Sequence, residues 1–253
     1  MLTAFVSQGH TMRNPRIHLP QPMQADARVE LNETAANHVA RVLRMKAGDP
    51  LVLFDGEGNG FQARVDQVEK RRVQVVIESV LESATESPLS IHLGQVMSRG
   101  DRMDWAIQKA TEMGVTEITP LLSERCEVKL SSDRADKRQQ HWQQVAISAC
   151  EQCGRNRVPR VHPPRPLTQW ASEQNSDLKL VLHHRTEQSL SSLSAPRTLS
   201  LLIGPEGGLS PLEIEQSLKL GFRPTALGPR VLRTETAPVA ALALAQYLWG
   251  DIG

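Results

Sequence analysis

The stretch LLIGPEGGLSPLEI, residues 201–214, joins a buried strand to a helix through a glycine-rich loop. The apolar run at 198–203 predicts the strand. Ser210 and Glu213 predict the helix start, because a serine at the N-cap and a glutamate three residues later form a capping box, and Pro211 suits the first helical position. A loop held in this way lies at the carboxyl end of a strand, which is where ligands bind in open α/β sheets.

The ligand expected at this loop is a nucleoside rather than a phosphate. Neither the Walker pattern nor the dinucleotide-binding glycine pattern is present, and Glu206 would repel a phosphate held at the helix N-terminus. A second glycine–proline loop within 226–246, ALGPRVLRTETAPVAALALAQ, again leads to an apolar helix, and VLHHR at 181–185 offers a third strand end. Together the loops would cradle an adenosine. The alternative is that residues 204–208 form only a tight turn.

Metal and redox chemistry are not expected. His183 and His184 are adjacent, but no partner cluster stands at ligand spacing. CEQC at 150–153 looks like a redox pair, yet these cysteines share one apolar helical stripe with Trp142, which favours buried packing. The chain has only 3 cysteines, which indicates no disulfide framework and a reducing compartment.

From residue 89 onward, strand and helix patterns alternate. A helix is predicted from Asp101 to Met113, with Asp101 placed to cap it and Gly114 to end it. Near-continuously apolar strands between helices predict an α/β fold with a mainly parallel sheet covered on both faces. The predicted strands lie at 89–97, 118–122, 178–183, 198–203 and 224–228.

Residues 16–84 are β-rich with one helix. Strand patterns occur at 51–55, 61–68 and 72–80. GEGNG at 56–60 partly mimics a nucleotide-binding glycine pattern, but it leads into another strand and is interpreted as a hairpin turn. We therefore expect a small barrel or folded sheet, followed by the polar linker ESATESP.

The composition is typical of a soluble globular protein. Of 253 residues, 40% are hydrophobic and 23% charged, with a net charge of +1, which excludes a disordered or fibrous chain. The most apolar segment, 237–249, is shorter than the roughly 20 residues that span a bilayer, so it predicts a buried helix. Residues 1–11 lack the features of a signal peptide and are interpreted as an upstream extension before a natural start at Met12.

Several motifs resemble those of the RsmE family, the SPOUT-class methyltransferases that make 3-methyluridine in 16S ribosomal RNA. The resemblance spans the chain from Met12 and rests on RNPRIHL, HVARVLRMKAGD, QVMSRGDRMDWAIQKATEMGV, SERCEVK, EQCGR, LIGPEGGLSPLEI and LGPRVLRTETAPVAAL. It implies a PUA-like RNA-binding β-barrel over 12–84 and a SPOUT domain with a trefoil knot over 85–253. It also implies a cytoplasmic homodimer that acts on 16S rRNA within the small ribosomal subunit.

The resemblance further implies S-adenosylmethionine as the methyl donor. Its site would be built from three strand ends, at Leu182, His183, Ile203, Gly204, Pro205, Gly208, Leu227, Gly228, Leu232, Arg233, Thr236 and Ala237.

Methylation of uridine N3 requires loss of the N3 proton. A cationic side chain near O2 or O4 would stabilise the uridine anion, and a carboxylate would take the proton. The candidates are Arg99 or Arg233 as the cation, and Glu235 or Glu206 as the base. For each of them, a salt bridge that holds a loop is the alternative.

Basic residues gather on one side of a predicted helix over 32–45. At about 100° per residue, one side carries the apolar residues and the other the basic ones; the apolar residues are Ala35, Val39, Val42 and Leu43. Guanidinium groups pair with phosphates, so RNA contact is the prediction and an ordinary solvated face the alternative. The RNA-binding candidates are Arg13, Arg16, His38, Arg41, Arg44 and Lys46, with Arg125 and Arg155 in the larger half.

Rival functions stay open. A SPOUT enzyme could methylate another RNA atom, such as a ribose 2′-oxygen, and a non-catalytic assembly factor could keep the fold without binding the cofactor. The intact GPEGG and LRTETA loops argue against the assembly factor. A phosphate-binding α/β enzyme is disfavoured by Glu206 and the missing lysine motif.

Overall fold

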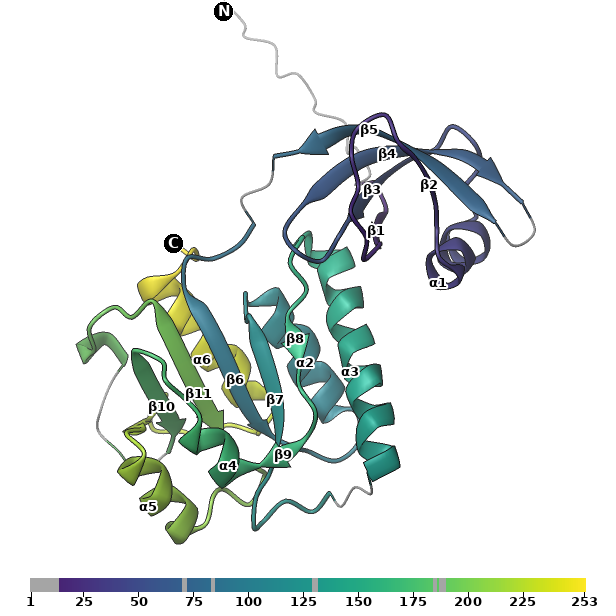
Figure 1. Cartoon of the computed structure of the whole chain (residues 1–253). Helices are drawn as coiled ribbons and strands as arrows, with labels where there is room; N and C mark the ends of the chain where they lie inside the picture. Colours follow the sequence, from purple (N-terminus) through teal and green to yellow (C-terminus); the bar gives the residue numbers. More distant parts are fainter. Residues whose placement is uncertain (1–13, 70–71, 83–84, 129–131, 184–185, 187–189) are drawn as a thin grey trace, which may run out of the picture. The chain divides into compact units, whose positions relative to one another are not determined.

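The computed structural model describes residues 14–253 apart from 70–71, 83–84, 129–131, 184–185 and 187–189. The chain forms two compact units, Met1–Ser83 and Ala84–Gly253 (Figure 1). The extension expected over 1–11 and the candidate Arg13 lie outside the described residues. No helix in the described part of the chain is long and apolar enough to cross a membrane.

The smaller unit is built on a five-stranded sheet with the order β1-β3-β4-β5-β2. β3 and β4 pair antiparallel, and the predicted hairpin turn lies between them. Asp55 holds this turn, because its carboxylate accepts hydrogen bonds from the backbone N–H groups of Glu57 and Asn59 at 2.8 and 3.1 Å. The strands are β1 (Arg16–His18), β2 (Arg28–Glu30), β3 (Pro50–Phe54), β4 (Gly60–Val68) and β5 (Val73–Leu81).

The prediction of one regular α-helix over 32–45 is wrong. An α-helical segment, α1 (Glu33–Asn37), continues as a π-helical turn over His38–Val42. A π turn is wider than an α turn, so a regular helical wheel misplaces the residues that follow. Val42, which was expected on the same side as the buried Val39, is 68% exposed.

The larger unit contains a seven-stranded sheet in the order β12-β10-β11-β6-β7-β8, with β9 also paired to β7. All of its described pairings are parallel, which confirms the predicted mainly parallel sheet. The carboxyl ends of its strands therefore lie at the same edge. The strands are β6 (Ser90–Val96), β7 (Glu117–Leu122), β8 (Arg160–Val161), β9 (Arg165–Pro166), β10 (Leu178–Leu182), β11 (Thr198–Ile203) and β12 (Arg223–Thr225).

Helices cover both faces of this sheet (Figure 1). Leu201 of β11 packs in a core that contains residues of α2, α3 and α6, whereas its neighbour Leu202 packs with Trp170 of α4. Successive strand residues thus serve opposite faces. The helices are α2 (Arg102–Glu112), α3 (Ser132–Cys153), α4 (Leu167–Ser172), α5 (Pro211–Lys219) and α6 (Thr236–Trp249), with a 3-10 turn at Leu190–Ser192.

Two helix starts test the predicted caps. At α5 the capping box is confirmed, because Ser210 Oγ accepts from the N–H of Glu213 at 3.2 Å and the Glu213 carboxylate accepts from the N–H of Ser210 at 2.8 Å. At α2 the predicted start is confirmed, because Asp101 is the N-cap residue, but it does not cap the helix through its side chain. The side chain of Asp101 makes no capping bond, and its carbonyl accepts from the N–H of Trp105 instead.

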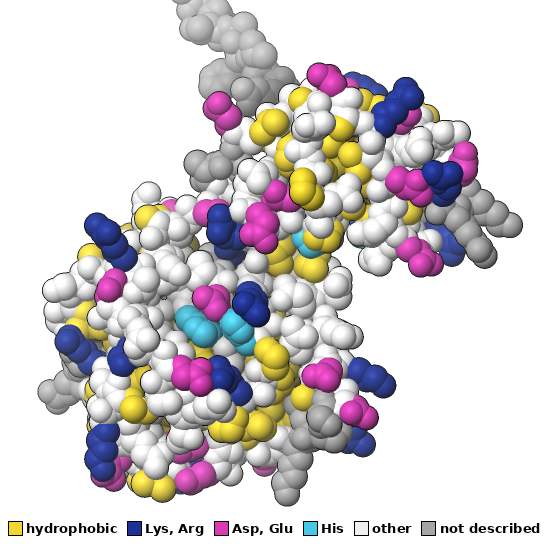
Figure 2. Space-filling view, in the orientation of Figure 1, with side chains coloured by type: hydrophobic (Ala, Val, Ile, Leu, Met, Phe, Trp, Pro, Cys, Tyr) yellow, Lys and Arg dark blue, Asp and Glu magenta, His cyan; other side chains and the backbone are white. Residues whose placement is uncertain are grey.

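A polar network lies near the amino ends of the central strands. Trp170 Nε1–H donates to His92 Nε2 at 3.2 Å, and His162 Nε2 lies 2.6 Å from the Glu117 carboxylate. Gly94 leaves room for the indole, since a Cβ there would lie 2.5 Å from it. Figure 2 shows histidine side chains of this unit gathered beside acidic and basic ones. Burial is the main cause that lowers the pKa of His92 to about 4.

Acid is expected to destabilise the larger unit through His92. Its folded pKa of about 4 lies below the ordinary 6.5, so the unfolded chain binds the proton more strongly. The stability is fully present above pH 6.5 and is lost as the pH falls through 4; the shift corresponds to roughly 3 kcal/mol. In His92→Gln, the free energy of unfolding should therefore vary less with pH across this window.

Denaturant titrations followed by tryptophan fluorescence measure this, because the 4 tryptophans all lie in the larger unit. His38→Gln, in the smaller unit, is the matched control and should keep the wild-type pH dependence. An unchanged pH dependence in His92→Gln would contradict the assignment.

Candidate active site

A cavity of about 1040 Å³, the first cavity, lies at the carboxyl ends of β10, β11 and β12. The structure brings together in its lining nearly all of the residues assigned to the cofactor from the sequence. The exception is Thr236, which lines a neighbouring cavity. Those in the lining are Leu182, His183, Ile203, Gly204, Pro205, Gly208, Leu227, Gly228, Leu232, Arg233 and Ala237.

Glycines shape the wall of the first cavity. At Gly204 an added Cβ would lie 3.1 Å from Cγ and 3.2 Å from the backbone nitrogen of Leu209. The chain can turn this tightly after β11 because no side chain is present. Gly208 and Gly228 have φ angles of +68° and +86°, the left-handed region that glycine adopts without strain.

Thr234 connects the two glycine loops. Its hydroxyl donates to the Gly204 carbonyl at 2.9 Å, and Gln95 Nε2 donates to the same hydroxyl at 3.2 Å. Both Thr234 and Gln95 are buried. Sequence reasoning missed this pair, because polar residue types alone do not reveal a contact between distant positions. The hydrogen bonds fix the loop after β11 against the loop before α6.

The lining of the first cavity fits S-adenosylmethionine. Ile203 and Leu227 offer apolar contact to an adenine ring, and the carboxylates of Glu206 and Glu235 suit a cationic sulfonium. Arginines in the wall suit the carboxylate of an amino acid. Thr225 Oγ1 is a buried atom in the same wall to which the described residues provide no hydrogen-bond partner.

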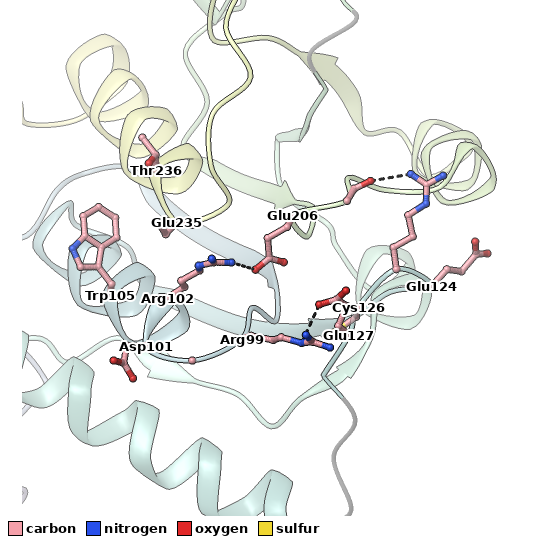
Figure 3. A pocket seen from close by; sticks show the side chains of 13 residues that line it. Arg99, Asp101, Arg102, Trp105, Glu124, Cys126, Glu127, Glu206, Glu235 and Thr236 are labelled. Atoms are coloured by element: carbon pink, nitrogen blue, oxygen red, sulfur yellow. Dashed lines mark hydrogen bonds and ion pairs between the residues drawn. The ribbon is translucent and has the colours of Figure 1, made fainter.

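A second cavity of about 1280 Å³ adjoins the first. The two share part of their lining, namely Arg102, Arg125, Glu206, Gly207 and Glu235. The other residues come from the chain after β6, the first turns of α2, the chain after β7 and the start of α6 (Figure 3). They are Arg99, Gly100, Asp101, Trp105, Glu124, Cys126, Glu127 and Thr236.

Ion pairs engage several charges around the second cavity. Arg102 pairs with Glu206 at 2.8 Å and Arg99 with Glu127 at 2.9 Å (Figure 3). Glu235, by contrast, takes part in none of the ion pairs found between described residues. Three of the four catalytic candidates line the second cavity: Arg99, Glu206 and Glu235. The fourth candidate, Arg233, lines the first cavity.

The RNA-binding candidates of the smaller unit are mostly accessible. Arg41, Arg44 and Lys46 are exposed and His38 is half-buried. The guanidinium of Arg16 lies 5.0 Å from the centre of the Phe54 ring. The π-helical turn therefore still presents basic side chains to solvent, although the wheel that predicted them is wrong.

Arg155 does not fit the role of an RNA contact. Its side chain is 4% exposed, donates to the carbonyls of Thr111 and Val115 at 2.8 and 2.9 Å, and pairs with Glu86 at 2.7 Å. These bonds hold the end of α2 in the interior, so a phosphate could reach the guanidinium only by breaking them. Arg125, the other candidate of this unit, is exposed at the rim of both cavities.

His92, Glu117 and His162 form one group that could hold a metal ion, with ligand atoms within 4.8 Å of one another. Hydrogen bonds already engage these atoms, so we assign the group to the polar network of the sheet. His184 lies outside the described residues. Of the CEQC motif, Cys150 is fully buried, as predicted for packing, whereas Cys153 is only half-buried.

Comparison with known families gives two matches. Residues 85–246 match an RNA methyltransferase domain, and residues 31–78 match an RNA methyltransferase PUA domain. The ribosomal RNA small subunit methyltransferase E of Buchnera aphidicola subsp. Schizaphis graminum is 36% identical over 242 residues, which cover 95% of this chain and 98% of that protein. The Bacillus subtilis protein of the same name is 32% identical, over 83% of this chain and 86% of its own length.

Solved structures give concordant matches. A Legionella pneumophila protein in complex with the bound cofactor SAM is 44% identical, with a TM-score of 0.92, over 94% of this chain and 99% of that one. A ribosomal RNA small subunit methyltransferase E from Neisseria gonorrhoeae, bound to S-adenosyl methionine, is 40% identical, with a TM-score of 0.91, over 95% of this chain and 100% of that one.

Proposed function

The chain belongs to the ribosomal RNA small subunit methyltransferase E (RsmE) family, and we propose that it methylates N3 of a uridine in 16S ribosomal RNA with S-adenosylmethionine as donor. Membership of this family confirms the resemblance found in the sequence. The activity of the protein is S-adenosylmethionine-dependent methylation of ribosomal RNA. The observation that carries the proposal is the shared wall: the cavity built from the glycine loops adjoins a second cavity rich in arginine and glutamate.

The first cavity is the proposed cofactor site. S-adenosylmethionine, when bound, supplies a methyl group on a sulfonium, which is electrophilic enough to need no further activation. The protein must therefore hold and orient it. The backbone at Gly204 and Gly228 would approach the adenosine, and Thr234 would keep the two loops at the right separation. Glu206 and Glu235 line both cavities, so their carboxylates would lie between the cofactor and the acceptor.

The second cavity is the proposed acceptor site. A uridine must be unpaired or flipped out to place N3 there, since N3 is covered in a base pair. An arginine near O2 or O4 would stabilise the anion that forms when the N3 proton leaves. Arg99 and Arg102 line this cavity, and Arg233 lines the cofactor side. Arg99 is held by Glu127 alone among the described ion pairs, at a rim position that a substrate could reach.

Glu235 is the better candidate for the base that takes the N3 proton. Glu206 already accepts a hydrogen bond from the Arg102 guanidinium at 2.8 Å, so its carboxylate is engaged. Glu235 lies in the wall common to both cavities without such a partner among the described residues. We therefore assign Glu206 to holding Arg102 and Glu235 to accepting the proton.

Finer features of the fold belong to the same proposal. A trefoil knot over the carboxyl-terminal strands is supported by the position of β10, which lies between β11 and β12 although both follow it in sequence. A closed PUA-like barrel is supported by the match over 31–78. A homodimer is supported by the exposed Leu244 and Tyr247 on α6. The substrate would be the small ribosomal subunit, which places the reaction in the cytoplasm.

The smaller unit is proposed to bind RNA phosphates through Arg41 and Arg44. The double variant Arg41→Glu/Arg44→Glu should bind unmodified small subunits at least about 10-fold more weakly, because two phosphate contacts become repulsive. Its affinity should also depend less steeply on salt, since each lost contact removes roughly one released counterion. Filter binding at several salt concentrations measures both.

The matched control reverses two basic charges elsewhere, in Lys219→Glu/Arg223→Glu, on exposed positions of α5 and β12. Similar losses in both double variants would mean that net charge alone matters. That result would remove the smaller unit's basic surface from the proposal.

Calorimetric titration with S-adenosylmethionine tests the cofactor assignment. The account expects saturable 1:1 binding per chain and a thermal midpoint that rises with ligand concentration, because the ligand binds only the folded state. Absence of both would favour a non-catalytic assembly factor that keeps the fold.

A further inference from the structure

Trp105 is one of the residues that line the second cavity, at its edge (Figure 3). It is 41% exposed, whereas Trp142 and Trp170 are almost fully buried. Its neighbours Met103 and Ala106 on α2 are buried in the core. Trp105 therefore lies outside the buried apolar face of its own helix. Burying an indole is favourable, and an exposed one at the edge of a substrate cavity therefore calls for an explanation.

The surroundings of Trp105 combine a flat apolar surface with polar groups. Arg102 lies one turn earlier on α2 and points towards Glu206 (Figure 3). Glu235 and Thr236, at the start of α6, line the same cavity. No other aromatic residue occurs among the described residues that line it. The lining thus combines one indole side chain with charged and hydroxyl groups.

A nucleobase matches this combination. Its edges need hydrogen-bond partners and its two faces need apolar contact, which proteins supply by stacking an aromatic ring. Methylation at a ring nitrogen also requires a fixed base plane, since the attacking lone pair lies in that plane. Charged side chains alone can contact the edge of a base, but they leave its tilt free.

We propose that Trp105 stacks on the acceptor base in the second cavity and sets its plane against the cofactor site. The inference rests on the proposed function, and it adds the residue that recognises the base as a flat aromatic group. Trp105 touches substrate but exchanges no proton with it.

Trp105→Ala should lower kcat/KM for unmodified small subunits by roughly 10- to 100-fold at saturating S-adenosylmethionine, the range of one lost stacking contact. Trp105→Phe should recover most of the activity, because a smaller ring still stacks. The affinity for S-adenosylmethionine should stay within about twofold in both variants, since Trp105 does not line the first cavity. Leu218→Ala is the control, because Leu218 is equally exposed at 41% and lines neither cavity.

Fluorescence gives a readout that a packing role would not produce. Uridine 5′-monophosphate should quench wild-type tryptophan emission in the presence of S-adenosylmethionine, whereas ribose 5-phosphate, which lacks the base, should not. The quenching should disappear in Trp105→Phe. Sedimentation of each variant completes the test. If a second copy of the chain covered the Trp105 ring, the loss of the ring in Trp105→Ala would change the oligomeric state instead of the quenching by the nucleotide.

Two failures are distinguishable. If wild type transfers no methyl group to small subunits, the proposed function fails. If wild type is active and Trp105→Ala matches it, or if Trp105→Ala only dissociates an oligomer, the stacking role alone is overturned.

Discussion

Gly204→Val is expected to weaken S-adenosylmethionine binding by about 100-fold or more. A Cβ at this position already meets Leu209 at 3.1 and 3.2 Å, so the two methyl groups of valine must displace Leu209 or fill the cavity. Either movement disturbs the loop whose carbonyl accepts the Thr234 hydrogen bond. Calorimetric titration measures the loss, and the methyl transfer rate should fall with it at fixed cofactor concentration.

Gly154→Ala is the matched control for Gly204→Val. Gly154 has φ +97° with open space around it and lies outside both cavities, so alanine strains the backbone there without touching the site. The control should lose thermal stability and retain cofactor affinity. Wild-type affinity in a folded Gly204→Val protein would show that the first cavity is not the cofactor site.

Glu235→Gln is expected to lower kcat by about 100-fold or more, the usual contribution of a positioned base. Glutamine keeps the shape of the side chain but cannot accept the N3 proton. The dissociation constant of S-adenosylmethionine should rise much less than kcat falls, because Glu206 still offers a carboxylate to the sulfonium in the same wall. Single-turnover rates at saturating cofactor and subunit isolate this step from binding.

Glu206→Gln provides the comparison that separates the two carboxylates. It should cost less than Glu235→Gln, because Glu206 acts by holding Arg102 at 2.8 Å. A larger loss in Glu206→Gln than in Glu235→Gln would exchange the two roles. Small losses in both would mean that neither carboxylate takes the proton.

The main sheet could be predicted because its strands are short, apolar and separated by helices. β11 coincides with the apolar run at 198–203, and the capping box at Ser210 fixed the start of α5. The order of the strands could not be predicted, because apolar strands buried on both faces do not specify their neighbours. The π-helical turn at His38–Val42 was also missed, since a periodicity argument assumes a regular helix.

The candidate site was predictable where it consists of local motifs. The two glycine loops carry their conformational requirements in their residue types, and the family resemblance assigned them to a cofactor. Contacts between segments that lie far apart in the sequence cannot be recognised from the residue types. Thr234 bonds to Gly204, and Arg155 bonds to Glu86 and the end of α2. The residue types alone predict neither the first contact nor the burial of Arg155.

Methyl transfer from labelled S-adenosylmethionine to unmodified small ribosomal subunits tests the central claim most directly. The recovered RNA is digested, and the labelled nucleoside is identified by mass spectrometry. The account predicts label in 3-methyluridine, which is lost in a folded Gly204→Val variant. Label in another nucleoside would contradict the assignment of uridine N3, and absence of label with subunits that a known methyltransferase can modify would contradict the enzymatic function itself.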